Sequence, residues 1–485
     1  MPGLLEAFVL LRAGHSPNLR YNIPMTETVL AVDIGSTWCK AAWLDSHGQM
    51  LAQGRAYTRD IPLGPHSTPN GFWAAFVAAV RQAAARLPAS ARPAAIGISC
   101  RALFGICLDA EGNGFWPAWD MALDRYTNPT ILYAYSDEAW GGANPYRYGY
   151  TPSFAGIFSW LREHRSEVMK RLVRAGALRD FIVYRMTGAW VTDPATGPNQ
   201  YIWPEGLRPL SGLPASALPI ILDPHCLAGG LTTPASQALG LPTGLPVVVG
   251  QHDGAAANLG VGAIRPNDGC FTLGTNFVFR GVMGQHPGTH AMGYWVAPGV
   301  WAFVGNIGQA TRQFELMTRA LGEDGDDISD LHRRLSPLAD TVAPGSEGLR
   351  LGPLPGDEAE IFGSVRQARR AGYPPGVVYR AILEAVVEAE QRLVNRARQA
   401  GAQPTRFVAT GGGAVNRAFA QVLASVLNGP VEMGQTEGGI LGAGMAAAVG
   451  AGWYGSLDAA LAGMGTPGPI IQPDPDVVAF YAQEE

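Results

Sequence analysis

Two short segments, one in each half of the chain, have a residue pattern that could hold phosphate groups. Each has an apolar, β-rich run, then a glycine followed by two small polar residues, then a second apolar run. This order is typical of a β-hairpin whose turn needs glycine for its backbone torsions. Backbone N–H groups and side-chain hydroxyls in such a turn form a concave anion site. The turns are Gly35-Ser36-Thr37, within Val29–Leu44, and Gly274-Thr275-Asn276, within Gly269–Arg280.

A single turn of this kind is also what an ordinary hairpin contains. Two matched turns favour a duplicated architecture in which each half contributes one of them. Facing each other across a cleft, the two turns could hold the β- and γ-phosphates of a nucleotide.

Asp33 is a carboxylate at the end of an otherwise apolar run, just before the first turn. A carboxylate there is costly to bury unless it is paired or lies near a cation. It could simply cap its own turn. Because it stands beside Gly35, Ser36 and Thr37, we favour a role in organising Mg²⁺ through water, since Mg²⁺ keeps much of its hydration and uses only one or two carboxylates.

Asp253 follows a valine-rich run and begins a stretch of small residues that predicts a closely packed helix. A carboxylate at a helix start is often only an N-cap. The same position would let Asp253 accept a proton from a substrate hydroxyl, which phosphoryl transfer to an alcohol requires. Asp253 is therefore the candidate general base.

A third glycine turn, Gly411-Gly412-Gly413, lies between a predicted strand and a predicted helix, and Asn416 follows it. Glycines let the backbone approach a flat ligand such as adenosine closely. This turn does not follow the GxGxxG dinucleotide spacing, and the chain has no GxxxxGK[ST] P-loop. By motif, this excludes a Rossmann dehydrogenase and a P-loop kinase.

Alternating strands and helices must position these residues. Apolar runs predict strands at 94–99, 102–108, 246–250 and 406–410, and helical patterns predict helices at 71–87, 158–174, 377–400 and 417–428. The segment 439–450 predicts a small-residue helix that can pack very closely. Strands that alternate with helices in both halves indicate the α/β class.

The length of 485 residues exceeds what one hydrophobic core usually serves, which predicts two domains. We place the N-terminal domain at residues 25–248 and the C-terminal domain at residues 249–485. Met25 stands just before the first convincing strand. Residues 1–24 are therefore expected to be a disordered or non-native extension.

Composition narrows the classes of partner and the compartment. The chain has 35 basic and 40 acidic residues, which gives no support for a nucleic-acid partner or a polybasic membrane anchor. No secretory signal and no apolar run of about 18 residues is evident, so we expect no membrane span and a cytoplasmic protein. The five cysteines form no CxxC pair and have no histidine at zinc-ligand spacing, which predicts buried thiols in a reducing compartment.

Taken in order, these motifs resemble the FGGY family of carbohydrate kinases from about residue 28 to about residue 455. The resemblance implies a duplicated actin-like, ribonuclease-H-like fold with two domains and a central cleft. It also implies ATP and Mg²⁺ as cofactors, a small sugar as substrate and a homodimer as a common state.

The resemblance also implies roles for particular residues. It identifies Asp33–Thr37 with Lys40 as the first phosphate motif, Gly274–Asn276 as the second, and Gly250–Gly262 as the segment that carries the catalytic base, Asp253. Asn276 stands where the family usually has Ser and can still donate and accept hydrogen bonds. The remaining matches are the adenosine motif with the helix behind it, at 411–416, Gln421 and 437–443, and a common family stretch at Pro344–Leu349.

Departures from the family pattern concern the sugar. Where members have Ser-Gly-Gln-Met-His-Gly or an Arg-Glu pair, residues 99–104 here offer Arg101 as the only candidate substitute contact. The Trp-x-Asp-x-Arg segment is altered, which leaves Asp120 and Asp124 as alternatives beside Arg125. His252 is the remaining expected substrate contact. The stretch around Asp253 resembles gluconate-type members and the overall layout resembles xylulose-type members, so both substrates stay open.

We therefore expect an ATP-dependent carbohydrate kinase, with Mg·ATP between two lobes and the sugar deeper in the cleft. Two alternatives stay open. One is a non-catalytic sugar- or nucleotide-binding regulatory protein of the same fold, and the other is a different actin-like ATPase, such as a chaperone or a filament protein. Sugar-dependent ATP turnover separates the kinase from both.

Overall fold

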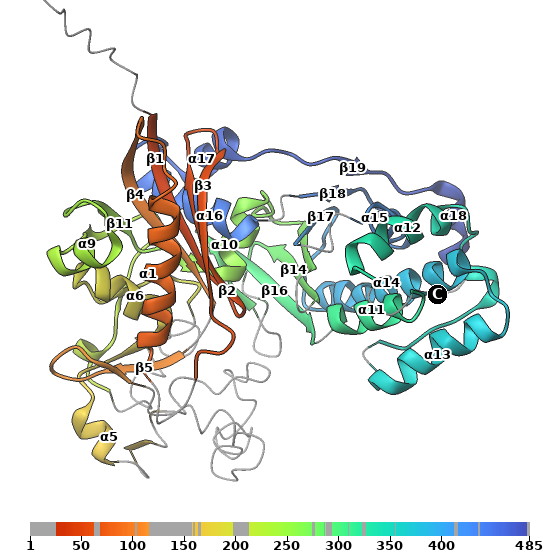
Figure 1. Cartoon of the computed structure of the whole chain (residues 1–485), viewed down its shortest axis with the longest axis horizontal. Helices are drawn as coiled ribbons and strands as arrows, with labels where there is room; N and C mark the ends of the chain where they lie inside the picture. The colour runs from red at the N-terminus through yellow and green to blue at the C-terminus, as the bar shows by residue number, and fades with distance from the viewer. Residues whose placement is uncertain are drawn as a thin grey trace, which may run out of the picture.

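Two mixed β-sheets form the framework of the protein, one in each lobe (Figure 1). The computed structural model describes residues 26–62, 68–101, 104–115, 158, 161–162, 166–196, 213–273, 277–285, 287, 293–308, 310–322, 326–354, 356–411, 416–434 and 437–482. The predicted extension at residues 1–24 lies outside this range.

The first sheet begins with an antiparallel meander of three strands, continues with parallel strands and ends at an edge strand that is again antiparallel to its neighbour. Its strand order is β10-β11-β4-β1-β2-β3, and the short β12 also pairs with β4. Strand β1 is antiparallel to β2 and parallel to β4, which is parallel to both β11 and β12. The strands are β1 (Thr26–Ile34), β2 (Trp38–Leu44), β3 (Met50–Tyr57), β4 (Ala91–Cys100), β10 (Leu227–Gly230), β11 (Pro246–Val248) and β12 (Gln251–His252).

The second sheet repeats this plan. Its order is β15-β16-β14-β13-β17-β18-β19, with β13 antiparallel to β14 and parallel to β17. In both sheets the first strand lies between an antiparallel second strand and a parallel strand from later in the chain, which is β4 in the first sheet and β17 in the second. The strands are β13 (Asp268–Leu273), β14 (Phe277–Met283), β15 (Gly293–Ala297), β16 (Val300–Ile307), β17 (Arg406–Thr410), β18 (Val431–Met433) and β19 (Ile470–Ile471).

This repeat confirms the predicted α/β class and the duplicated fold. Both predicted glycine-turn hairpins are present, as β1–β2 and β13–β14. The smaller pairings lie beside the first sheet. They comprise β5 (Phe104–Leu108), β6 (Gly114–Phe115) and β7 (Arg174–Ala177), and β8 (Val191–Thr192) with β9 (Ile220–Ile221).

Amphipathic helices cover the first sheet. Helix α1 (Asn70–Ala84) buries Phe72, Phe76 and Val80, whose spacing of four residues places them on one helical face. Helices α6 (Leu178–Thr187) and α9 (Thr233–Leu239) lie beside it (Figure 1). The helix predicted at 158–174 is wrong at its end, because α5 (Ser166–Arg171) stops there and Arg174 begins strand β7.

The second sheet packs against a long central helix, α14 (Pro375–Gln399), whose buried residues include Val378, Ile382 and Val386. This agrees with the helix predicted at 377–400. The other helices of this part of the chain are α11 (Ala310–Arg319), α12 (Ile328–Asp340), α13 (Glu358–Arg370), α15 (Arg417–Val426), α17 (Leu457–Met464) and α18 (Pro475–Tyr481). Within the described range, every helix is too short or too polar to cross a lipid bilayer.

Helix α16 (Gly438–Gly450) comes from the end of the chain but packs on the first sheet and on helix α10 (Asp253–Gly260). A Cβ atom on Gly442 would lie 2.0 Å from the carbonyl oxygen of Ala256 in α10, and one on Gly97 of β4 would lie 2.0 Å from that of Ala443. Such separations leave no room for any side chain. The close packing predicted for this small-residue segment is therefore confirmed.

The domain boundary near residue 248 stays a prediction. Strand β11 ends at Val248, but β12 at Gln251–His252 still pairs with β4 of the first sheet.

The contact between α10 and α16 predicts that Gly442→Ala destabilises the fold. The added methyl group has to displace the backbone of Ala256, and overpacking of this kind costs about 3 kcal/mol. Chemical denaturation of the purified protein measures the change. Gly363→Ala is the matched control, because Gly363 lies inside helix α13 with nothing within 4 Å of its Cβ position. Its substitution should be neutral or stabilising by up to about 1 kcal/mol. Equal stabilities of the two variants would contradict the packing described here.

Candidate active site

Three neighbouring strands bring polar residues to one edge of the first sheet. The register pairs Asp33 of β1 with Ser99 of β4, and Ser99 with Gln251 of β12. The three strands are parallel, so their carboxyl ends meet at this edge, which is where α/β sheets bind ligands. Ser99 Oγ donates a 2.6 Å hydrogen bond to Asp33 Oδ1.

Burial raises the pKa of Asp33 to about 6. The hydrogen bond from Ser99 and the charge of Lys40 act in the opposite direction, and the carboxylates of Asp253 and Glu437 add to the rise. The first turn of α16 lies directly against this carboxylate, since a Cβ on Gly439 would be 3.1 Å from its atoms. Asp33 is therefore a carboxylate whose charged form a nearby cation would stabilise.

Asp253 is the first residue of α10 and directly follows β12. The N-cap position belongs to His252, and Gly254 N–H donates to His252 Nδ1 at 3.0 Å and to Asp253 Oδ1 at 2.7 Å. The Asp253 side chain is 42% exposed, whereas that of His252 is 15% exposed. Because His252 takes the cap, the carboxylate of Asp253 remains open to a substrate.

Lys40 connects strand β2, which follows the turn at Gly35, to a late segment of the chain through an ion pair. It lies on β2 opposite Asp33, and its Nζ is 2.8 Å from both carboxylate oxygens of Glu437, the residue before α16. The two side chains are 40% and 37% exposed. The ion pair is therefore accessible to a competing anion.

The first phosphate turn differs from expectation in one respect. Gly35 does not have a left-handed φ, so the torsional reason for glycine is wrong here. The reason is space, because a Cβ would lie 3.2 Å from Trp38 O, which accepts the Gly35 N–H at 2.9 Å. Ser36 is exposed and Thr37 is partly buried.

The turns of the second lobe start side by side. Gly411 has a φ of +90°, and a Cβ there would lie 2.8 Å from Leu273 O, the last residue of β13. The adenosine turn therefore leaves its strand next to the point where the second phosphate turn begins. Gly274, Thr275, Asn276, Gly412 and Gly413 lie outside the described residues.

Asn416 has a structural role in this lobe. Its Oδ1 caps α15 by accepting from Phe419 N at 3.1 Å, and its Nδ2 donates to Tyr379 Oη at 2.8 Å. Tyr379 Oη also lies 2.6 Å from His332 Nδ1. The side-chain amide of Asn416 is thus held in a buried network behind the glycine turn.

Two of the expected substrate residues, Arg101 and His252, lie within the described part of the chain. Arg101 follows β4, its N–H donates to Ile34 O at 2.9 Å, and burial lowers the pKa of its guanidinium against the opposing effect of Asp253. Arg101, His252 and Asp253 therefore cluster beyond the same strand ends. Asp120, Asp124 and Arg125 lie outside the described residues.

Sequence reasoning missed several residues close to Asp253. Both amide atoms of Gln251 are buried without a hydrogen-bond partner among the described residues, as are Arg280 Nε and Tyr294 Oη. Arg280 and Tyr294 come from the second sheet and pack against the backbone of Gly254. A polar residue inside an apolar strand, as Arg280 is in β14, was the available signal.

The family stretch Pro344–Leu349 lies away from these groups and has a structural explanation. Glu384 of α14 accepts hydrogen bonds from Gly345 N at 2.9 Å and Ser346 Oγ at 2.8 Å, and it pairs with Arg380 at 3.0 Å. This buried carboxylate fixes the loop. Gln421 likewise donates to a backbone oxygen, that of Gln472, at 2.8 Å.

Comparison with known proteins accounts for this arrangement. The N-terminal domain of the FGGY family of carbohydrate kinases matches residues 28–260, and its C-terminal domain matches residues 275–451. The autoinducer-2 kinase of Escherichia coli is 24% identical over 469 residues, which cover 88% of this chain and 87% of that protein.

Two solved structures share the fold. The xylulose kinase from Rhodospirillum rubrum has a TM-score of 0.74 at 22% identity, covering 94% of this chain and 96% of its own. The gluconate kinase from Lactobacillus acidophilus has a TM-score of 0.75 at 18% identity, with the same coverage of 94% and 96%. Since the family's two domains match most of the sequence in order, the chain belongs to the FGGY family of carbohydrate kinases, phosphotransferases with an alcohol group as acceptor.

Proposed function

We propose that this protein transfers the γ-phosphoryl group of Mg·ATP to a hydroxyl of a small sugar, polyol or sugar acid, with Asp253 as general base. The observation that carries the proposal is the exposed carboxylate of Asp253, which directly follows β12 at the sheet edge that holds Asp33. A base must lie within hydrogen-bond reach of the proton it takes, and an exposed carboxylate at a strand end can do so.

Asp33 is the proposed Mg²⁺-organising residue. A carboxylate oxygen is a preferred Mg²⁺ ligand, directly or through water. One oxygen of Asp33 already accepts the Ser99 hydrogen bond, and burial disfavours its charge, so a nearby cation fits this site. When bound, Mg²⁺ would neutralise charge on the β- and γ-phosphates.

Backbone turns and Lys40 are proposed to hold the nucleotide. The turns at Gly35 and Gly274 would donate N–H groups to phosphate oxygens, and the turn at Gly411 would lie against adenosine. Phosphate would compete with Glu437 for Lys40, because both are oxygen anions and the ion pair is accessible.

Asp253 is proposed to accept the proton of the attacking hydroxyl as the new O–P bond forms. General-base assistance contributes about 10²- to 10⁴-fold in rate, with positioning and charge neutralisation supplying the rest. His252 and Arg101 are proposed to orient substrate oxygens around this carboxylate, because His252 Nδ1 lies 3.4 Å from Asp253 Oδ1 and the charge of Asp253 acts on Arg101.

The identity of the acceptor is proposed only as a class. Relatives and structural neighbours are an autoinducer-2 kinase, a xylulose kinase and a gluconate kinase, whose named substrates are small and rich in oxygen. Xylulose-like and gluconate-like acceptors are the ones we propose first. A cytoplasmic location is proposed as well, because Cys39, Cys100, Cys226 and Cys270 are free thiols, which persist in a reducing compartment.

Loss of the base should abolish turnover but leave nucleotide binding intact. ADP release is measured with Mg·ATP against xylulose, ribulose, gluconate, glycerol, erythritol, deoxyhexuloses and autoinducer-2. For the substrate that responds, Asp253→Asn should lower kcat by about 10²- to 10⁴-fold, because Asn keeps the size of the side chain but cannot take the proton.

Asp357→Asn is the matched control, since Asp357 also lies at a helix start, as the N-cap of α13. Asn caps a helix as well as Asp does, so Asp357→Asn should keep the fold and the kcat of wild type. Retention of wild-type kcat by Asp253→Asn would overturn the assignment of the base. A lack of sugar-dependent ADP release across the whole panel would count against the proposed acceptor class.

The raised pKa of Asp33 predicts a pH-dependent cost to stability in the nucleotide-free protein. Below pH 3.8 the carboxyl group is protonated in both the folded and the unfolded chain. As the pH rises from 3.8 to about 6, the unfolded chain loses this proton while the folded protein keeps it, so the free energy of unfolding falls. Wild type should therefore lose about 2 kcal/mol relative to Asp33→Asn between about pH 4 and pH 6.

Denaturation curves at several pH values measure this difference. Ser99→Ala removes the hydrogen bond that lowers the pKa of Asp33, so its loss of stability should extend to higher pH. Parallel pH profiles for wild type and Asp33→Asn would show that the partly buried carboxylate carries no such cost.

A further inference from the structure

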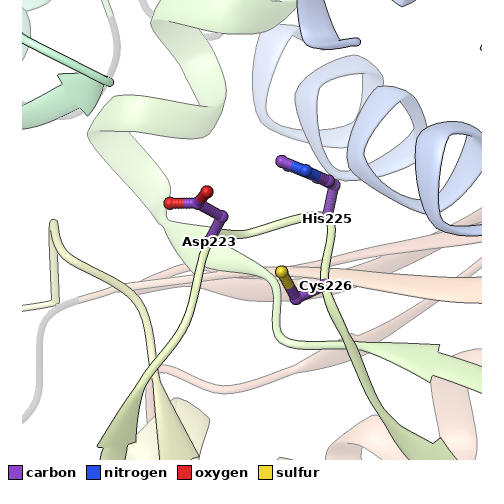
Figure 2. Close-up of side chains that lie close together, drawn as sticks. All are labelled: Asp223, His225 and Cys226. Atoms are coloured by element: carbon purple, nitrogen blue, oxygen red, sulfur yellow. The ribbon is translucent and has the colours of Figure 1, made fainter. Parts of the chain in front are cut away.

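Three side chains with metal-binding chemistry converge on a turn far from the phosphate turns in sequence. Asp223, His225 and Cys226 each offer one ligand atom, and these atoms all lie within 4.8 Å of one another (Figure 2). The turn lies between β9 and β10, and Cys226 N–H closes it by donating to Asp223 O at 2.9 Å. None of the three side chains is fully buried, so an ion could reach them from solvent.

The structure brings together what sequence spacing did not reveal. The cysteines were expected to be buried, which holds for Cys39, Cys100, Cys107 and Cys270. It is wrong for Cys226, which is partly exposed and lies beside an imidazole and a carboxylate. The interval between Asp223 and Cys226 matches no common zinc motif, so only the folded turn shows the cluster.

The backbone that carries the ligands is held on several sides. Leu222 N–H donates to Thr192 O at 2.9 Å, Gly250 N–H to Pro224 O at 2.9 Å, and Val249 N–H to Cys226 O at 2.9 Å. A Cβ on Gly450, at the end of α16, would lie 2.9 Å from His225 O. The turn is therefore pre-organised, which lowers the cost of bringing three ligands to one ion.

His225 supplies an independent observation. Its Nδ1 is buried and has no hydrogen-bond partner among the described residues. A buried polar atom without a partner costs free energy, and an imidazole nitrogen in that state is normally bonded to a donor, an acceptor or a metal.

We propose that Asp223, His225 and Cys226 form a Zn²⁺ site. Thiolate and imidazole together select a borderline-soft ion such as Zn²⁺ over Mg²⁺ or Ca²⁺, which prefer oxygen ligands. Three protein ligands leave the fourth tetrahedral position to water. The site is thus distinct in chemistry and position from the Mg²⁺ proposed at Asp33.

The location gives the ion a structural role. Gly250, which donates to the turn, lies three residues before Asp253, and the buried guanidinium of Arg179 donates to the carbonyl of Val249 from another side. An ion on the turn would tie this segment to β10 and to the end of α16. The inference does not depend on phosphoryl transfer, so the two proposals can fail independently.

Direct metal binding to the untagged, full-length protein tests the site. After treatment with a chelator and addition of Zn²⁺ alone, wild type should retain one Zn²⁺ per chain, measured by elemental analysis after gel filtration. Asp223→Asn, His225→Asn and Cys226→Ser should each weaken Zn²⁺ binding by at least about tenfold in competition with a chromophoric chelator. His47→Asn, which replaces an exposed histidine of the β2–β3 turn, should bind as wild type does.

Alkylation of the unmutated protein provides a readout that does not depend on the variants folding. Zn²⁺ should slow the modification of Cys226 by iodoacetamide at least about tenfold, followed by peptide mass spectrometry, because a coordinated thiolate is a poor nucleophile. Mg²⁺ at the same concentration should not. Retention of Zn²⁺ by all three variants, absence of stoichiometric Zn²⁺ in wild type, or equal alkylation with and without Zn²⁺ would each overturn the proposal.

Discussion

The backbones of β4, α10 and α16 touch, because glycine stands at each crossing point. Gly97, Gly260 and Gly442 each face a carbonyl oxygen at a distance that a Cβ could not occupy. This contact carries the last part of the chain into the first lobe (Figure 1). It places the first turn of α16 against Asp33 and Glu437 against Lys40. The proposed phosphate site therefore depends on a helix that is about 400 residues away in sequence.

The charges brought together in this way are unbalanced. The carboxylates of Asp253 and Glu437 both act on Asp33, while Lys40 is the cation that acts on it. Burial is the main cause of the raised pKa of Asp33, and the two neighbouring carboxylates add to the rise. An arrangement of this kind favours a ligand that brings its own cation, as Mg·ATP does. In the proposed nucleotide complex, the same closeness would let Lys40 exchange Glu437 for a phosphate without moving far.

Contacts from segments that are distant in sequence hold the backbone that leads to Asp253. Arg179 is almost fully buried, pairs with Asp180 at 2.7 Å and Asp193 at 3.2 Å, and donates to the carbonyl of Val249. On another side, the turn that contains Cys226 accepts the N–H groups of Val249 and Gly250. The proposed role of Asp253 as a base requires it to lie within about 3 Å of a reacting hydroxyl, and such support would help because small displacements reduce proton transfer.

Local patterns in the sequence determined the elements and the identity of most candidate residues. Alternating apolar runs and four-residue spacings identified β1, β4, β17, α1 and α14, and a carboxylate in an apolar strand identified Asp33. Helices α11, α12 and α13 have polar faces and were not predicted, and the end of α5 was missed because β7 follows it within three residues. These features depend on short-range periodicity, which a single chain displays without folding.

Only the tertiary structure decided which distant residues meet. Ser99, Gln251 and Glu437 approach Asp33 and Lys40 through strand register and through the packing of α16, and neither can be read from spacing along the chain. The turn of Asp223, His225 and Cys226 shows the same limit at short range, because side-chain directions and not residue intervals bring its ligand atoms together. The sequence thus determined the kinds of residue available and the elements that carry them, whereas their mutual distances and charges arose from packing between segments that are remote along the chain.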